Sequence, residues 1–487
     1  MDIFLIFPTQ LYKNTKLINS NNIYLIEEPI YFTDLKYHKL KLAYHRATMK
    51  YYYDYLKKKK FNVKYIEFYN VSNIFYKNIK YNNIYIYDPI EHKLLYKLIK
   101  IYKNKLIILP SQNFLIYSDL KILKNDIYTN NYLFNKFYIF YRKKFNILID
   151  KNNKPIGGEW SYDKYNRKKI PKNYTFSNNI LPENYKIIKN KYTIEATNYI
   201  NKYFTNNYGH INFIYPITHK DSDKWFNNFL KYKIDNFGEF EDAILENNPF
   251  IYHSILTPMM NVGLLIDKDI LNKILEFNNN NDTNIQNIEG FIRQLFWRNY
   301  MMSIYMIEKP IIKFNGSKTR KINNKIYNKL WTGNTNMFPI DSIIKNKIIP
   351  YSYFHHIERL MVVGNFMKLC LLDDTLIYKM YMEWTIDAFN WVMYGNVYGM
   401  VLNNIKIMTR NYIASSNYIF KMSDFNDDNN WSNIFDALYY NYILTNYDKL
   451  KNDYSLRYQL NYTKKLSDTK KNNLIKQAKL YLHDLYK

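Results

Sequence analysis

The chain has 487 residues, 47% of them hydrophobic and 23% charged, and it contains one cysteine, Cys370. This composition excludes a mainly disordered chain, a disulfide-built fold and an all-cysteine metal site within one chain. The net charge of +27 favours a polyanionic partner such as DNA, RNA or a membrane surface, although A/T-rich codons alone would also enrich the chain in lysine.

Short apolar runs alternate with helical patterns along the first part of the chain. Such alternation of strands and helices is typical of a parallel sheet with helices on both faces. We therefore predict an α/β domain with a Rossmann-like parallel sheet over residues 1–130. Its expected strands are residues 3–7, 23–26, 63–68, 84–87 and 106–109, and its expected helices are residues 37–57 and 92–102.

The pattern weakens over residues 131–190, where glycine and proline clusters interrupt a polar stretch, and we predict a connecting segment on the surface. Long helical periodicities dominate from residue 191 onward, which predicts a large all-α domain over residues 191–487. Its clearest expected helices are residues 193–204, 223–233, 288–306, 352–371 and 375–393.

The sequence gives no sign of membrane insertion or secretion. No apolar run approaches the roughly 18 residues that a transmembrane helix needs, and the apolar N-terminus lacks a basic flank. We expect a soluble, intracellular protein with no membrane partner that acts as a monomer. The composition suggests an A/T-rich source genome, such as that of a large DNA virus, which leaves the compartment open between virus and host cytoplasm.

Two polar constellations stand out near the middle of the expected all-α domain. His355 and His356 lie side by side with Arg359 one turn further along. This pattern fits either a helix that faces a ligand or a pair of capping and core histidines. Asp387 lies in an expected apolar helix, where it either pairs with Arg359 or faces solvent. No second histidine or cysteine cluster is nearby in sequence, so a zinc site is not predicted.

Two further segments carry polar groups at helix starts or along a helix face. Residues 253–258 form a hydroxyl-rich turn, typical of either an anion or diphosphate site or an ordinary N-cap. Residues 293–298 mix arginines with aromatic side chains, which fits a DNA-phosphate contact or an amphipathic surface helix. The chain has no P-loop and no dinucleotide-binding glycine motif, which argues against the usual nucleotide-hydrolysing classes.

Taken together and in order, these segments resemble the photolyase/cryptochrome flavoproteins. The resemblance is strongest to the bacterial (6-4) photolyases and cryptochromes, or deoxyribodipyrimidine photolyase-related proteins, a branch that usually carries an iron–sulfur cluster. It extends along nearly the whole chain. The matching segments are residues 37–39, 46–47, 110–115, 157–163, 166–168, 237–243, 249–261, 290–300, 331–333, 355–365 and 422–424.

The resemblance implies an α/β antenna domain, a long linker and an all-α domain that holds FAD in a U shape. It also implies residue roles at matching positions. The flavin diphosphate and ribityl turn is matched by Ser254, Leu256, Thr257 and Asn261, and the helix that lines the flavin and lesion pocket is matched by Gln294, Trp297 and Arg298. The lesion-facing pair is matched by His355 and His356, and the pair that spans the isoalloxazine ring by Arg359 and Asp387. Positions that line the substrate pocket are matched by Tyr412 and Tyr418, and an aromatic residue near the flavin by Trp331.

Several positions depart from the family pattern. The four cluster cysteines correspond to Pro339 or Ile340, Asn426, Asn429 and about Asn433, so we predict that no iron–sulfur cluster is bound. The acidic residue that faces the reactive flavin nitrogen corresponds to Met393, which cannot exchange a proton. A tryptophan of the electron-transfer path corresponds to Met380, and Trp384 or Trp391 is a candidate substitute. The acidic residue expected after Arg298 is Asn299.

The resemblance implies light-driven repair of UV-damaged DNA, with an electron passed from excited, reduced FAD to a (6-4) lesion and a proton supplied by His356 with His355 assisting. A cyclobutane lesion stays open as the substrate. Two alternatives are a cryptochrome-like photoreceptor without repair activity and a light-independent nucleic-acid-binding protein. The antenna domain resembles the lumazine-binding version, and Glu28, Tyr31 and His38 are the expected lining residues.

Overall fold

The computed structural model describes residues 1–128, 132–176, 185–310, 323–408 and 410–487. Its N-terminal part contains a five-stranded sheet in which all neighbouring strands run parallel, in the order β3-β2-β1-β4-β5. All four residues of the central strand β1 are buried, as expected for a strand covered on both faces. The predicted α/β class is confirmed. The strands are β1 (Ile3–Ile6), β2 (Asn22–Ile26), β3 (Asn62–Ile66), β4 (Ile84–Tyr87) and β5 (Leu106–Leu109).

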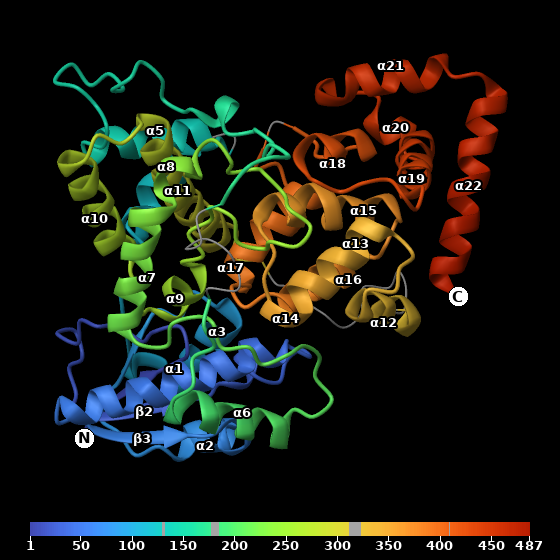
Figure 1. Ribbon diagram of the computed structural model, residues 1–487. Helices are drawn as coiled ribbons and strands as arrows, with labels where there is room; N and C mark the ends of the chain where they lie inside the picture. Colours follow the sequence, from blue (N-terminus) through green and yellow to red (C-terminus); the bar gives the residue numbers. More distant parts are fainter. Residues whose placement is uncertain (129–131, 177–184, 311–322, 409) are drawn as a thin grey trace.

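The helix α6 (Lys191–Tyr203) packs against α1 (Lys39–Lys58), at the base of the molecule in Figure 1. Arg46 of α1 pairs with Glu195 of α6 at 2.5 Å, and the hydroxyl of Tyr199 donates to Glu27 at 2.9 Å. Residues just beyond the predicted domain limit at 190 therefore contact the α/β part. The other limit, at residue 130, lies outside the described residues. The remaining helices of the α/β part are α2 (Asn73–Asn78) and α3 (His92–Tyr102).

The predicted connecting segment contains a helix that the sequence analysis did not predict, α5 (Phe134–Lys144), with one buried face. Phe137 and Tyr141 of α5 pack on Phe296, with ring centroids 6.4 and 5.9 Å apart. Arg142 is fully buried and donates to the carbonyl oxygens of Leu148 and Trp160 at 2.6 and 2.8 Å. Aromatic residues are so abundant throughout the chain that the helical spacing of this short segment did not stand out.

From residue 191 onward the described chain is mostly helical, as predicted. The long helix α11 is buried along most of its length and contacts α5, α8, α10 and α17, while α19 and α22 pack together far from the sheet (Figure 1). The helices are α7 (His219–Tyr232), α8 (Ile234–Phe237), α9 (Thr257–Val262), α10 (Asp267–Asn280), α11 (Ile285–Glu308), α12 (Asn324–Thr332), α13 (Phe338–Ile343), α14 (Ile349–Tyr351), α15 (Asn365–Leu369), α16 (Asp374–Trp384), α17 (Asn390–Met393), α18 (Ser416–Met422), α19 (Trp431–Thr445), α20 (Tyr447–Leu450), α21 (Arg457–Lys465) and α22 (Asp468–Tyr486), together with the π-helices η9 (Ile344–Ile348), η10 (Glu358–Gly364) and η11 (Tyr394–Val401).

Two helices predicted as continuous are interrupted. The helix expected over residues 375–393 breaks between α16 and α17, and the one expected over residues 352–371 begins only at His356 and is π-helical over η10. The two irregular segments bind each other: the Ile386 N–H donates to the Ser352 carbonyl at 2.9 Å, and the Ser352 hydroxyl donates to the Trp384 carbonyl at 2.7 Å. These contacts replace the hydrogen bonds that a continuous helix would make.

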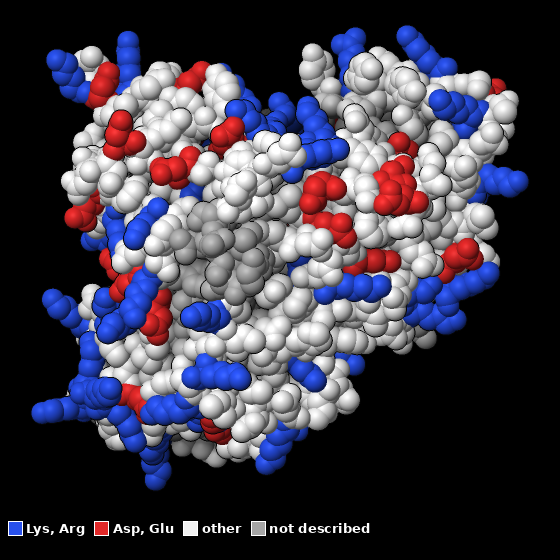
Figure 2. Space-filling model, in the orientation of Figure 1, with Lys and Arg blue, Asp and Glu red and all other residues white. Residues whose placement is uncertain are grey.

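Charged side chains are spread over the surface. Figure 2 shows lysine and arginine scattered over the visible face with acidic side chains between them, rather than gathered in one stripe. Among the described residues, no helix combines the length and the apolar composition needed to cross a lipid bilayer.

Candidate active site

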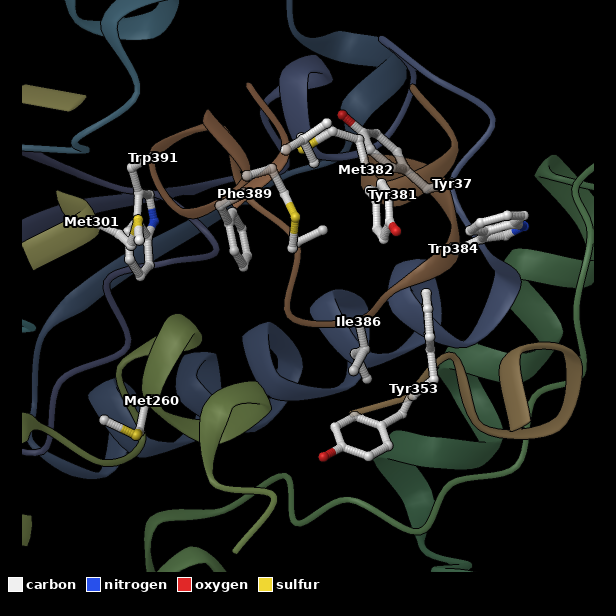
Figure 3. Packing of buried hydrophobic residues seen from close by; sticks show 14 of the residues in the cluster. Tyr37, Met260, Met301, Tyr353, Tyr381, Met382, Trp384, Ile386, Phe389 and Trp391 are labelled. Atoms are coloured by element: carbon white, nitrogen blue, oxygen red, sulfur yellow. The ribbon is translucent and has the colours of Figure 1, made fainter. Parts of the chain in front are cut away.

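Three of the predicted site residues meet at one small cavity of about 40 Å³. His356 and Arg359 approach it from the start of η10, and Met393 approaches it from the end of α17. Part of the surrounding core, including Tyr381 of α16, is drawn in Figure 3. The remaining lining residues are Leu360, Tyr381, Asn396, Val397 and Val401.

Arg359 pairs with Asp387, as one of the two sequence interpretations expected. The Arg359 Nη2 atom lies 3.0 Å from Asp387 Oδ1, and the Thr257 hydroxyl donates to Asp387 Oδ2 at 2.9 Å. The side chains of Arg359 and Asp387 are 14% and 8% exposed. Asp387 does not lie in a helix, contrary to the prediction, but in the break between α16 and α17. Leaving the helix lets its carboxylate reach both partners.

Two residues of the α/β part hold the segment that carries Asp387. The ammonium group of Lys41 donates to the carbonyl oxygens of Met382 and Ala388 at 3.0 and 2.6 Å. The carboxylate of Glu91 accepts from the backbone and side-chain N–H groups of Asn390 at 3.1 and 2.7 Å. Burial lowers the pKa of Lys41 to about 7 and raises that of Glu91 to about 7. The sequence analysis missed both, because an isolated lysine or glutamate gives no signal in this chain.

A buried network connects Asp387 to α11. The Asn261 amide donates to the Asp387 carbonyl at 2.9 Å, and Arg298 donates to Asn261 Oδ1 at 3.1 Å and pairs with Asp267 at 2.9 Å. Arg298 is only 7% exposed, so the predictions of a DNA-phosphate contact and of a surface helix are both wrong for this residue. Asn299, in place of the family's acidic residue, donates to Asp267 at 2.5 Å. An acid there would instead have repelled Asp267.

The two adjacent histidines have different surroundings. The side chain of His356 is exposed where it borders the cavity, and the surrounding protein together with the charge of Arg359 lowers its pKa to about 4. His355 is 3% exposed and stacks on His253, with ring centroids 4.6 Å apart. Its Nδ1 atom accepts from the Ile357 N–H at 3.3 Å, which leaves the Nε2 atom as the protonated one in the neutral ring. Of the two histidines, His356 is therefore the one that borders the cavity.

Stability is expected to fall as the pH is lowered from 6.5 to 4, because the stacked histidines resist protonation. Burial lowers the pKa of His253 to about 4, and burial with His253 and Lys347 lowers that of His355 well below 6.5. A depressed folded-state pKa gives stability that is complete above pH 6.5 and lost as the pH falls through about 4, at about 3 kcal/mol for His253. Urea unfolding at several pH values should show a shallower pH slope for His253→Gln than for wild type. The exposed His483, changed to Gln, serves as the control; equal slopes for all three proteins would contradict the assignment.

Four other predicted residues lie in two further groups. Gln294 hydrogen-bonds to Glu241, the neighbour of Asp242. Burial raises the pKa of Tyr412 and of Tyr418, and the charges of Asp163 and Asp242 raise both further, Asp163 more for Tyr412 and Asp242 more for Tyr418. Burial and Glu241 raise the pKa of Asp242 to about 8. Trp297 packs on Phe134, with ring centroids 4.7 Å apart, and its indole N–H has no hydrogen-bond partner among the described residues.

The last two predicted positions lie in the turn before α9. Leu256 is 2% exposed and directly precedes this helix, which begins at Thr257, within the segment predicted as a turn. The Ser254 carbonyl accepts from the indole N–H of Trp225 at 2.9 Å, and Ser254 borders a separate cavity. The roles of all these residues toward a flavin or a lesion stay predictions.

Asn396 is a cavity residue that the sequence analysis missed. Its side-chain amide donates to the Val392 carbonyl at 2.8 Å, while its Oδ1 atom is buried without a hydrogen-bond partner among the described residues. It lies three residues after Met393 and borders the same cavity as His356. Asparagine is so common in this sequence that one in a helical pattern carried no signal.

The segment that corresponds to the family's cluster cysteines is held by hydrogen bonds and packing. Trp431 donates to the Asn426 carbonyl at 2.6 Å, and the Ser432 N–H donates to Asp427 at 3.1 Å. Phe425 packs edge-on against Phe338, with centroids 5.9 Å apart. Cys370 is buried, and the described residues contain no group of three or more His, Cys, Asp or Glu side chains suited to a metal ion. That no cluster is bound stays a prediction.

Comparison with known proteins agrees with the fold. A family model described as deoxyribodipyrimidine photo-lyase-related protein matches residues 4–215. The (6-4) photolyase of Agrobacterium fabrum is 30% identical over 364 residues, which span 72% of this chain and 70% of that protein. A bacterial class III photolyase from Agrobacterium tumefaciens superposes with a TM-score of 0.59 at 13% identity, covering 99% of this chain and 97% of that one. An archaeal photolyase from Sulfolobus tokodaii, solved with two FAD molecules, gives 0.55 at 13% identity, with 99% and 100% covered.

Proposed function

Because the chain belongs to the deoxyribodipyrimidine photolyase-related family, we propose that it is a light-driven, FAD-dependent DNA repair enzyme that acts on the (6-4) lesion. The observation that carries the proposal is the meeting of His356 with the Arg359–Asp387 pair at one buried cavity. A proton donor and a fixed charge pair are the groups that such a reaction requires of the protein.

The polar groups at the cavity fit the edge of a flavin ring. Arg359 donates hydrogen bonds, as ring carbonyl oxygens require, and the unpartnered Oδ1 atom of Asn396 accepts, as a ring N–H requires. The cavity of about 40 Å³ is smaller than the ring, so the apolar side chains of Leu360 and Val397 must move when it enters. A bound, fully reduced flavin supplies an electron when it absorbs light. Thr257 and Arg359 hold Asp387 in place meanwhile.

His356 holds and moves the proton in this proposal. With a pKa of about 4 it is neutral at pH 7 in the free protein. Negative charge in the cavity favours the protonated ring and raises its pKa toward neutrality. His356 then carries a proton at the moment when the electron-rich lesion needs one. His355 assists from the neighbouring position, where stacking on His253 holds its ring in place.

The decisive experiment uses photoreduced protein and oligonucleotides that carry either a (6-4) or a cyclobutane lesion. We expect repair of the (6-4) lesion in light and none in the dark. Repair of the cyclobutane lesion alone would assign the other substrate. A flavin-bound sample that repairs neither lesion would contradict the proposal.

A cryptochrome-like photoreceptor is the second candidate, and Met393 is the observation that favours it. Methionine at the cavity cannot exchange a proton with a flavin, which alters redox behaviour rather than DNA binding. A flavin-bound protein that changes its redox state in light without repair would support this candidate. A light-independent nucleic-acid-binding protein would instead purify without a yellow colour.

An antenna chromophore of the lumazine type is proposed for a large cavity of about 1120 Å³ beside the α/β part. The sequence-based lining residues do not border it: Glu28 pairs with Lys97 at 2.7 Å, Tyr31 is buried, and His38 contacts the Ile349 carbonyl at 3.1 Å. Their places are taken by neighbouring aromatic side chains. These are Phe32, Tyr37, Tyr96, Tyr203 and Phe204.

Flavin photoreduction is expected to be largely lost in Trp384→Phe, because aromatic rings lead from the cavity to the surface through this residue. Tyr381 lies at the cavity, and the centroids of the successive pairs Tyr381–Trp384, Trp384–Trp331 and Trp331–Tyr208 are 6.1, 6.3 and 4.7 Å apart. Figure 3 shows Trp384 beside Tyr381, with Trp391 at the other side of the view. Phenylalanine is harder to oxidise than tryptophan and interrupts the route.

The measurement is the rate of flavin bleaching under blue light with a thiol as the external reductant. Trp431→Phe is the matched control, since Trp431 is equally buried but packs on Phe420, with ring centroids 4.9 Å apart, in a different part of the helical region. Equal bleaching rates in Trp384→Phe and wild type would exclude this route.

A further inference from the structure

The two most exposed large apolar side chains among the described residues lie on one helix face. Tyr454 and Tyr458 are 84% and 79% exposed, and Tyr462, one turn further along, is 43% exposed. The first belongs to the short 3₁₀-helix η12 (Tyr454–Leu456), which leads directly into α21. A spacing of four residues puts the three rings on one side, about 6 Å apart along the helix axis. We call these three residues the tyrosine face.

The opposite side of the same helical segment is fixed to the protein. Leu456 and Leu460 are 3% and 4% exposed, and the ring of Tyr462 packs on Tyr440, with centroids 6.0 Å apart. The tyrosine face is therefore held in place and directed outward, at the end of the molecule farthest from the sheet (Figure 1). Contiguous exposed rings of this kind are typical of a surface that binds a partner.

The charges around the tyrosine face are positive. Between Asp453 and Asp468 the chain carries Arg457, Lys464 and Lys465, all exposed, and no acidic residue. Arg457 and Lys465 each follow a member of the tyrosine face by three positions, so they lie beside it on the helix surface. In Figure 2 the same corner, at the upper right, carries lysine and arginine side chains with few acidic ones. A partner for this face must combine negative charge with flat apolar surface.

Unpaired nucleic acid has both properties. Its bases stack on aromatic rings, while its phosphates pair with arginine and lysine. In a duplex the faces of the bases are covered by one another, and an anionic lipid surface has no rings to stack. We propose that the tyrosine face binds an unpaired strand of DNA, with bases on Tyr454 and Tyr458 and phosphates at Arg457 and Lys465.

The position of the tyrosine face relates it to the proposed function. The Ser455 hydroxyl accepts from the Asn411 N–H at 3.1 Å, so the face begins beside the segment that carries Tyr412. Tyr412 is one of the residues expected to line the substrate pocket, and DNA held at that pocket would lie near α21. The choice of DNA rather than RNA rests on the proposed function, whereas the binding of an unpaired strand does not.

The test measures how tightly the full-length protein binds a fluorescent, undamaged oligothymidylate in the dark. Tyr454→Ser/Tyr458→Ser removes two rings that are too exposed to support the fold. We expect its affinity to fall roughly a hundredfold, about tenfold for each ring, with an unchanged salt dependence. Tyr454→Phe/Tyr458→Phe keeps both rings and should bind as wild type does. The control is Tyr69→Ser, which removes a tyrosine that is 53% exposed in the α/β part.

A second variant tests the charges beside the rings. Arg457→Gln/Lys465→Gln should reduce the slope of log affinity against log salt concentration by about 1.4, at about 0.7 for each cation that meets a phosphate of a single strand. Heparin is a polyanion without bases, so it separates charge from stacking. Its affinity should fall in this variant and stay unchanged in Tyr454→Ser/Tyr458→Ser.

The other outcomes would count against the proposal. Equal oligothymidylate affinity in wild type and Tyr454→Ser/Tyr458→Ser would overturn it, and tighter binding of oligouridylate would overturn the choice of DNA and assign RNA. A change from dimer to monomer in the serine variant, seen by light scattering at constant oligonucleotide affinity, would assign the face to a second copy of this chain. A protein that binds the strand through the tyrosine face but repairs no lesion would refute the proposed function and leave this inference intact.

Discussion

His356→Ala is expected to reduce light-driven repair of the (6-4) lesion by roughly 10²–10⁴-fold, the usual contribution of a positioned general acid. His356 is the histidine of the adjacent pair that borders the cavity, while the His355 ring is buried against His253. Flavin content should stay unchanged, because the Arg359–Asp387 pair does not depend on the imidazole. The measurement is the repair yield per absorbed photon.

The pH dependence gives an independent check of the same role. The free protein holds His356 neutral at pH 7, so substrate must raise its pKa before it can donate a proton. Repair should therefore fall as the pH rises above the raised value, and this limb should vanish in His356→Ala. His483→Ala, on the exposed surface of α22, should behave as wild type. Wild-type repair yield in His356→Ala would eliminate the proton-donor role.

The alternation of apolar strands and helical patterns was enough to predict the α/β part. Strands such as β4 (Ile84–Tyr87) are short, apolar and bounded by polar residues, so each strand can be recognised from its own local sequence. The break at Asp387 was not predictable in the same way. It depends on hydrogen bonds from Ser352 and Lys41, which lie 35 and 346 positions earlier in the chain. Apolar periodicity shows which face of a segment is buried. It does not show which distant groups form the hydrogen bonds that a broken helix no longer makes.

The candidate site was predicted where the residues themselves are distinctive. A pair of adjacent histidines and an arginine one turn away point to His356 and Arg359, which do border one cavity. Lys41 and Asn396 were missed because lysine and asparagine are abundant in this chain, so the copies at the site look like the others. Glu91 was missed because an isolated glutamate carries no recognisable pattern. Arg298 shows the converse: its aromatic neighbours suggested a surface, yet it is held inside by Asp267.

Asp387→Ala is expected to destabilise the protein by about 3–5 kcal/mol and to abolish flavin binding, because it leaves the Arg359 guanidinium 14% exposed and unpaired. The hydroxyl of Thr257 loses its acceptor as well. Asp387→Asn, which keeps the shape and one acceptor oxygen but loses the charge, should cost less. Denaturant unfolding gives the stability, and absorbance at flavin wavelengths gives the cofactor content.

A surface ion pair provides the matched control. Asp448→Ala removes a carboxylate that is 90% exposed and lies 3.1 Å from Lys451, so it should change stability by less than about 1 kcal/mol. The double variant Arg359→Met/Asp387→Ala removes both charges and should be more stable than Asp387→Ala alone, because no unpaired cation stays buried. If the double variant loses the sum of the two single effects, the pair is not coupled. The Arg359–Asp387 contact would then be a consequence of the fold rather than what keeps the cavity's charges in place.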